Sequence, residues 1–245
     1  MAANRFTVLT EEEPSVDTID SPQEATPADK IDITFLSAAL KGASIQQDTE
    51  ADTKKAAVSG AKQKSTHRQP LVWVDLEMTG LDLQKDTVIE IACLITDGRL
   101  RHPVEGPNLA IHHSDEVLSN MNEWCIEHHG ASGLTDRVRN SAVSMQEAEE
   151  QVLTFVTKHV PEPKVALLAG NSVHVDLAFL RQCMPRLVDH LHYRIVDVSS
   201  IAEVCRRWCP EIAKAAPRKE RLHMALADIK ESIEELRYYK TACFR

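Results

Sequence analysis

The chain has 245 residues, of which 43% are hydrophobic and 27% are charged, and its formal net charge at pH 7 is −9. This length accommodates one domain with a buried core and an appendage, and no apolar run is long enough to span a bilayer. The acidic balance excludes the long basic groove of most nucleic-acid binders, which neutralises many phosphates. A nucleic-acid substrate would have to be short, with bound cations supplying positive charge.

Residues 1–69 lack sustained hydrophobic periodicity, and this composition predicts a disordered N-terminal extension ahead of a folded domain at 70–245. The extension carries 8 basic and 11 acidic residues, and Arg5 is the only base before Glu11, Glu12 and Glu13. A mitochondrial presequence is Arg-rich and poor in acids, so the targeting signal is weak. The protein is expected to be intracellular, in the cytoplasm and/or the mitochondrion. The six cysteines follow no disulfide rhythm and are expected to be reduced, and the spacing of Cys205 and Cys209 does not complete a zinc site.

From residue 70 the sequence predicts an α/β domain. Strands are expected at 71–78, 86–96 and 108–113, and the Asp97-Gly98 dipeptide favours a hairpin between the last two. Helices are expected at 114–130, at 144–160 with a Ser144/Glu147 capping box, at 173–184, at 199–209 and at 224–239. Short strands at 165–169 and 194–198 separate them. A three-stranded antiparallel meander followed by alternating strands and helices predicts a mixed sheet flanked by helices.

The first strand carries two acids on one face, because Asp75 and Glu77 alternate with Val72, Val74 and Leu76. Neighbouring carboxylates at the end of an apolar strand repel each other and are costly to desolvate, so a divalent metal between them is a natural partner. The alternative is a strand with two solvated acids on its open face.

Two later positions add acids where an enzyme would need them. Asp176 follows Gly170-Asn-Ser-Val-His-Val, and Asp228 follows His223 by five residues. Strand ends of an open α/β sheet converge on one crevice, so these acids can meet Asp75 and Glu77, and four carboxylates can hold two Mg²⁺ or Mn²⁺ ions. His223 and Asp228 would lie about 140° apart on a continuous helix, so His223 fits better in the preceding loop, as a mobile general base. Taken singly, Asp176 and Asp228 are ordinary helix acids and His223 is an ordinary loop histidine.

Three segments together resemble the exonuclease motifs of the oligoribonuclease family, within the DEDDh 3′-to-5′ exonucleases. Further similarity at 121–125, 129–135, 192–199 and 236–239 extends the resemblance over 70–240, and residues 1–69 are not covered. The three motif segments are Val74-Asp-Leu-Glu-Met-Thr-Gly-Leu81, Gly170-Asn-Ser-Val-His-Val-Asp176 and His223-Met-Ala-Leu-Ala-Asp-Ile-Lys-Glu-Ser232.

The resemblance implies a ribonuclease H-like fold and a metal-dependent 3′-to-5′ exoribonuclease, in which His223 is the general base. It implies that Leu81 wedges against the bases of a very short oligoribonucleotide and that Trp124 stacks near its 3′ end. It also implies a homodimer. The implied metal ligands are Asp75, Glu77, Asp176 and Asp228. The implied pocket for the 5′ phosphate consists of His129, Ser172, Ser199 and, from the other subunit, Tyr193 and Arg194.

On this basis we expect cleavage of very short oligoribonucleotides, including dinucleotides, to nucleoside 5′-monophosphates. An exonuclease for longer RNA or DNA ends and a non-catalytic protein that binds nucleic-acid ends remain alternatives. Two departures from the family pattern lie near the last ligand: Ala227 replaces a second acid, and Met224 replaces a more usual Arg after the base.

Overall fold

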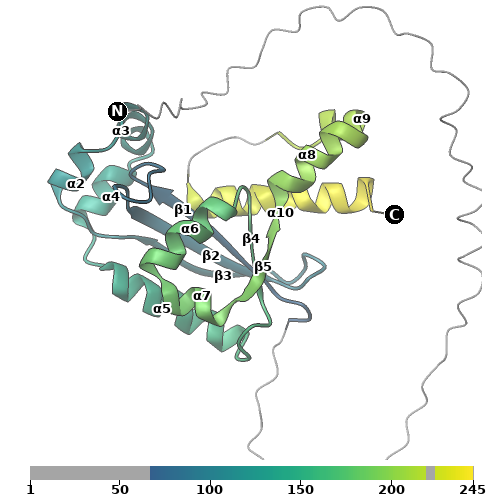
Figure 1. The fold of residues 1–245 in the computed structure, drawn as a ribbon, viewed down its shortest axis with the longest axis horizontal. Coiled ribbons are helices and arrows are strands. Elements are labelled where there is room, and N and C mark those ends of the chain that lie inside the picture. Colours follow the sequence, from purple (N-terminus) through teal and green to yellow (C-terminus); the bar gives the residue numbers. More distant parts are fainter. Residues whose placement is uncertain (1–66, 219–223, 245) are drawn as a thin grey trace, which may run out of the picture. The chain divides into compact units, whose positions relative to one another are not determined.

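The computed structural model describes residues 67–218 and 224–244. Five strands form one mixed sheet in the order β3-β2-β1-β4-β5 (Figure 1). β1, β2 and β3 pair antiparallel, and β4 and β5 run parallel to β1, so the predicted mixed sheet is confirmed. The strands are β1 (Leu71–Met78), β2 (Val88–Thr96), β3 (Val104–Ala110), β4 (Leu167–Gly170) and β5 (His192–Asp197).

Helices flank the sheet, and the Ser144/Glu147 capping box begins one of them as predicted. The predicted single helix at 114–130 is wrong. It is two helices, because Asn122 accepts a hydrogen bond from the Cys125 backbone N–H and starts a new helix there. The helices are α2 (Asp115–Ser119), α3 (Glu123–Ala131), α4 (Leu134–Asn140), α5 (Met145–His159), α6 (His174–Cys183), α7 (Pro185–His190), α8 (Val198–Trp208), α9 (Pro210–Lys214) and α10 (Ala225–Ala242). None of the helices in these described ranges is long and apolar enough to cross a membrane.

The alternation along β1 divides the core into two layers. Val72, Val74 and Leu76 pack in one cluster with the apolar faces of α5, α6 and α7. Trp73 points to the opposite face and packs in a second cluster with the first half of α10. Because Asp75 and Glu77 share the face of Trp73, the strand delivers both acids to the α10 side.

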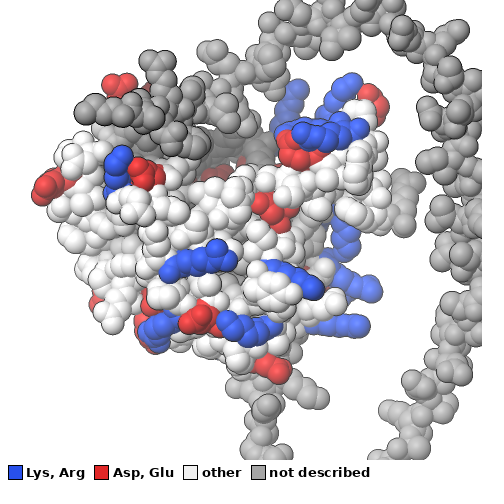
Figure 2. Space-filling view, viewed as in Figure 1, with Lys and Arg blue, Asp and Glu red and all other residues white. Residues whose placement is uncertain are grey.

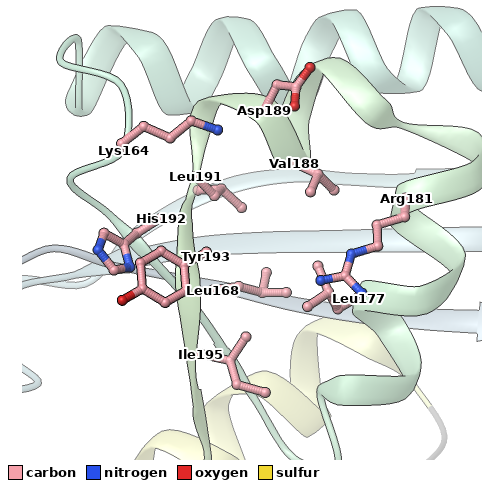
Figure 3. Close-up of a pocket in the computed structure, with 10 residues that line it drawn as sticks. All are labelled: Lys164, Leu168, Leu177, Arg181, Val188, Asp189, Leu191, His192, Tyr193 and Ile195. Atoms are coloured by element: carbon pink, nitrogen blue, oxygen red, sulfur yellow. The ribbon is translucent and has the colours of Figure 1, made fainter.

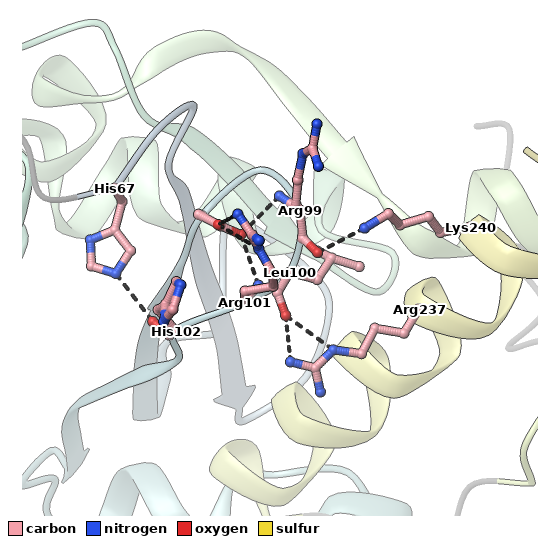
Figure 4. Close-up of polar contacts among 8 residues, drawn as sticks. His67, Arg99, Leu100, Arg101, His102, Arg237 and Lys240 are labelled. Atoms are coloured by element: carbon pink, nitrogen blue, oxygen red, sulfur yellow. Dashed lines mark hydrogen bonds and ion pairs between the residues drawn. The ribbon is translucent and has the colours of Figure 1, made fainter.

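The far half of α10 is fixed to the turn between β2 and β3 (Figure 4). The Arg237 guanidinium donates to the Leu100 carbonyl, and Lys240 Nζ donates to the Arg99 carbonyl at 2.9 Å. Leu100 itself is buried against the α10 cluster. These contacts fix where the N-terminal turn of α10, which carries Asp228, meets β1.

Candidate metal centre

The sheet opens at the end of β1. β1 pairs with β4 only over Leu71–Trp73, whereas its pairing with β2 continues to Met78. Beyond Trp73, the Leu76 backbone N–H donates instead to Asp176 Oδ1 at 3.0 Å. Asp176 lies in the first turn of α6, where the helix dipole favours a negative charge. The opening thus brings α6 against the acid-bearing end of β1.

Three of the four predicted ligands come together at this opening. Asp75, Glu77 and Asp228 each offer a carboxylate oxygen, and these oxygens lie within 4.8 Å of one another. All three side chains are partly exposed, so an ion can reach them. Asp176 is buried beside β1 and lies outside this group of three, so its role as a ligand stays a prediction.

The electrostatics of the cluster are unfavourable without a cation. Burial, followed by the negative charges of Glu90 and Asp228, raises the pKa of Glu77 to about 8. Burial also raises the pKa of Asp176 to about 7. Oxygen ligands in a partly exposed acidic cluster fit hard divalent cations, which would offset both the repulsion and the desolvation. The residues present therefore suit a divalent-metal site.

A tight loop follows β1 and carries Leu81. The Asp86 carboxylate accepts hydrogen bonds from Thr79 Oγ1 at 2.9 Å and from the Asp82 backbone N–H at 2.8 Å. A Cβ atom at Gly80 would lie 2.4 Å from the same carboxylate, so another residue there would displace the Asp86 side chain and its hydrogen bonds. The loop leaves Leu81 74% exposed next to the end of β1.

The helix α3 meets the cluster through His129. Buried His129 donates from Nε2 to the Met78 carbonyl at 3.0 Å, and its Nδ1 lies 3.9 Å from Glu77 Oε2. Trp124 is 49% exposed, stacks on His128 at 3.9 Å and meets His129 edge to face. Trp124 is thus connected to the acidic cluster through His129.

Asp197 organises the region around Ser172 and Ser199. Its Oδ1 accepts from the Ser172 N–H at 2.9 Å and from Ser199 Oγ at 2.7 Å, and its Oδ2 lies 3.3 Å from His174 Nδ1. Burial alone would raise the pKa of Asp197, but hydrogen bonds from Ser199, His174 and Ser172 lower it below its ordinary value. Asp197 was not among the residues predicted from the sequence, although an Asp just before the helix expected at 199–209 is a typical N-cap signal, and Asp197 is the N-cap of α8.

Tyr193 and Arg194 lie apart from these groups, on β5 at the edge of the sheet. Tyr193 is 76% exposed, stacks on His192 and lies under the Arg194 guanidinium at 5.4 Å. Both Tyr193 and His192 border a hollow of about 490 Å³ between β5, α6 and α7 (Figure 3). Lysine and arginine side chains on this side are interspersed with acids and neutral surface (Figure 2), so the face shown carries no continuous basic groove over its described part.

Two predicted features lie outside the described residues. His223, the predicted base, belongs to the undescribed stretch 219–223, and almost all of the predicted extension falls within the undescribed residues 1–66. Met224 is the N-cap of α10, and the helix begins at Ala225. Ala227 and Asp228 follow in the first turn.

Comparisons with known proteins agree with this geometry. The Exonuclease family model (RNase_T) matches residues 72–236. The mitochondrial oligoribonuclease of Mus musculus is 55% identical over 177 residues, covering 72% of this chain and 74% of that protein. The oligoribonuclease of Arabidopsis thaliana is 45% identical over 210 residues, covering 86% of this chain and 94% of that protein.

Solved structures resemble the chain in fold. A complex of Escherichia coli exonuclease I with single-stranded DNA superimposes with a TM-score of 0.57 at 16% identity, over 75% of this chain and 42% of the other. The chain thus spans less than half of that protein, and this likeness bears on the fold alone. Together with the sequence relatives, it confirms the predicted ribonuclease H-like exonuclease fold. The chain belongs to the oligoribonuclease family of exonucleases.

Proposed function

We propose that the protein is a metal-dependent 3′-to-5′ exoribonuclease that degrades very short oligoribonucleotides, including dinucleotides, to nucleoside 5′-monophosphates. The observation that carries the proposal is the meeting of Asp75, Glu77 and Asp228 within 4.8 Å at the open end of β1. Family membership supports the reaction class, and the net charge of −9 supports a short substrate.

The proposed ligands for two divalent cations, Mg²⁺ or Mn²⁺, are Asp75, Glu77, Asp176 and Asp228. When bound, the cations would neutralise charge on the phosphodiester and favour ionisation of water. His223 accepts the proton of the attacking water, and the 3′-oxygen of the preceding nucleotide leaves in line. The Asp176 carboxylate is held in place by the hydrogen bond from the Leu76 N–H.

Selection of very short strands is proposed to come from two sets of contacts, one to the bases and one to the 5′ phosphate. Leu81, in the loop after β1, and Trp124, which contacts His129 on α3, offer exposed apolar surface, and such surface binds any base. Ser172 and Ser199 are held together by Asp197 and are proposed to bind a 5′ phosphate, with His129 contributing from α3. A pocket that closes around a terminal phosphate would leave no room for a longer chain.

The decisive assay measures how the rate of release depends on the length of the substrate. The protein should release nucleoside 5′-monophosphates fastest from oligoribonucleotides of two to five residues, in the presence of Mg²⁺ or Mn²⁺, and Asp75→Ala should abolish release. A rate that rises toward twenty nucleotides would favour the second candidate, an exonuclease for longer RNA or DNA ends. That candidate has some support from the fold neighbour named as an exonuclease I bound to single-stranded DNA. Binding of strand ends without any release would leave only the non-catalytic alternative.

We further propose a homodimer in which Tyr193 and Arg194 complete the phosphate pocket of the partner. β5 is an edge strand, and Tyr193 and Trp208, at 76% and 77% exposure, present large apolar surface on β5 and the following helix. Mixing two inactive variants tests this. Asp75→Ala and Arg194→Ala subunits, exchanged at equal amounts, should recover about a quarter of wild-type activity, because half of the dimers then contain one complete site of two.

The compartment is proposed to be the mitochondrion. The relatives from mouse, human and Saccharomyces cerevisiae carry the word mitochondrial in their names. Fractionation of cells that express the full chain tests this proposal, and recovery in the cytosolic fraction alone would contradict it.

A further inference from the structure

Glu90 on β2 is a buried acid directly opposite a metal ligand. In the antiparallel register of β1 and β2, Glu90 is the partner of Glu77, just before a bulge at Met78. The two side chains therefore point to the same face, and Glu90 is only 1% exposed. Like charges directly opposite each other destabilise a sheet, so this pair needs a positive partner.

Arg137 on α4 forms a hydrogen bond with one of the two oxygens of the Glu90 carboxylate. Arg137 Nη1 donates to Glu90 Oε1 at 2.6 Å, and the arginine side chain is 42% exposed. The other oxygen, Glu90 Oε2, is buried and has no hydrogen-bond partner among the described residues. A buried charged acceptor left unused costs free energy, so an unused oxygen beside a metal cluster indicates a further partner.

Direct ligation does not fit this oxygen. The oxygens that lie within 4.8 Å of one another belong to Asp75, Glu77 and Asp228, and Glu90 is outside that group. Divalent cations such as Mg²⁺ keep several water ligands in protein sites, and those waters donate hydrogen bonds to nearby carboxylates. An acid one layer behind the ligands is placed to accept such a bond.

We propose that Glu90, held by Arg137, is an outer-sphere residue of the metal centre: its Oε2 accepts a hydrogen bond from a water molecule bound to a cation held by Asp75, Glu77 and Asp228. Glu90 is thus a positioning residue that acts through water, and Arg137 is the support that keeps its carboxylate in place. This role rests on the metal site of the proposed function. The competing explanation is an ion pair that only joins α4 to β2.

The test measures Mn²⁺ binding by the full chain in the absence of substrate, using titration calorimetry. Glu90→Gln keeps the shape of the side chain and an acceptor for Arg137 but removes the charge. Its dissociation constant for Mn²⁺ should rise about tenfold, which is the smallest effect expected when a residue behind the metal ligands is changed. The melting temperature of the metal-free protein should not fall, because repulsion with Glu77 is relieved. Wild-type affinity in Glu90→Gln would overturn the proposal.

Two further variants keep the test decisive. Glu150→Gln removes an acid on α5 whose exposed ion pair with Arg186 joins α5 to α7, so this variant should bind Mn²⁺ as the wild type does. Arg137→Gln removes the support of the Glu90 carboxylate, so the metal-free protein should melt lower. Mn²⁺ should raise its melting temperature by less than in the wild type, because the affinity for Mn²⁺ falls. An equal Mn²⁺-induced rise would count against the proposal even if Glu90→Gln failed to fold.

Failure of this inference is separable from failure of the proposed function. If the wild type binds Mn²⁺, Asp75→Ala does not, and Glu90→Gln binds normally, only the role of Glu90 is wrong. If the wild type itself binds no Mn²⁺, the metal site is wrong.

Discussion

Buried carboxylates near the two ends of β1 have pKa values shifted in opposite directions. Beyond the N-terminal end of β1, in the turn between β2 and β3, Asp97 is only 6% exposed. It accepts hydrogen bonds from the backbone N–H groups of Arg99 and Arg101, at 2.9 and 2.8 Å, and from the Arg101 guanidinium at 3.0 Å. Burial alone would raise the pKa of Asp97, but these bonds lower it. At the other end, the pKa of Glu77 is raised to about 8.

The difference separates a structural acid from a functional one. The chain supplies every positive partner that Asp97 needs, so its charge is stable in the protein alone. Around Glu77 the nearest charges are mainly negative, and Arg137 is bound to Glu90. A buried acid thus marks a ligand site only where the fold leaves its charge uncompensated.

The largest expected effect follows from Asp228→Asn. Removing one ligand charge should lower exonuclease activity by about 100- to 1,000-fold, because charge stabilisation at the phosphate is lost. The metal-free protein should keep or gain thermal stability, since the repulsion with Glu77 is reduced. Monophosphate release and thermal unfolding in EDTA measure the two effects. A large loss of metal-free stability would mean that Asp228 is a structural acid like Asp97.

The pH dependence of stability should differ between the two ends. Glu77 has a raised pKa, so its contribution is fully present below about pH 4.5 and is lost as pH rises toward 8. The metal-free protein should therefore become less stable between pH 5 and pH 8, and Asp176 adds to this trend because its pKa is also raised, to about 7. Asp97 has a lowered pKa, so its contribution is lost only at acid pH, below 3.8.

Thermal unfolding in EDTA across this pH range measures the trend. Glu77→Gln should flatten it, and Mg²⁺ should reverse it, because a bound cation favours the ionised acids. A stability that rises steadily from pH 5 to pH 8 in EDTA would contradict the electrostatic account of the cluster.

Local sequence patterns were sufficient for much of this fold. The alternation in β1 placed Asp75 and Glu77 on one face, and the capping box gave the start of α5. The third strand was expected at 108–113 but runs over Val104–Ala110, because Gly106 and Pro107 obscured its pattern. Pro107 is tolerated on this edge strand, and a Cβ at Gly106 would lie 2.4 Å from the Phe155 ring, so glycine lets α5 approach.

The contacts between distant segments could not be predicted from local patterns. The pairing of Glu90 with Arg137 and the fixation of Asp176 by the Leu76 N–H join residues 47 and 100 positions apart. Each depends on which strands pair and where β1 leaves β4, which a single sequence does not specify. That Asp75, Glu77 and Asp228 can meet was predicted from the convergence of strand ends in an α/β sheet, and the family resemblance singled out these acids as ligands.

Asp97→Ala should reduce stability without affecting chemistry. The change leaves the Arg99 and Arg101 N–H groups without their acceptor in a turn where Leu100 and His102 already have positive φ angles, 65° and 54°. We expect a loss of about 2 kcal/mol in the free energy of unfolding. Urea denaturation measures this, and the turnover rate at saturating substrate should stay near the wild-type value. A matching loss in Mn²⁺ affinity would show that the two ends of β1 are coupled.

The smallest effect on activity should come from replacing Trp124, on the helix α3 that contacts the C-terminal end of β1. Trp124 is half exposed and contacts His129, whose Nδ1 lies 3.9 Å from Glu77 Oε2. Loss of a base-stacking surface costs about 1 to 3 kcal/mol, so Trp124→Ala should raise KM for a short oligoribonucleotide about tenfold. The turnover rate should change little, because the indole is proposed to bind a base and is not a metal ligand, and Trp124→Phe should lie between the two. If Trp124→Ala instead lowers the turnover rate with KM unchanged, the indole acts by holding His129 against β1, and α3 belongs to the support of the metal centre.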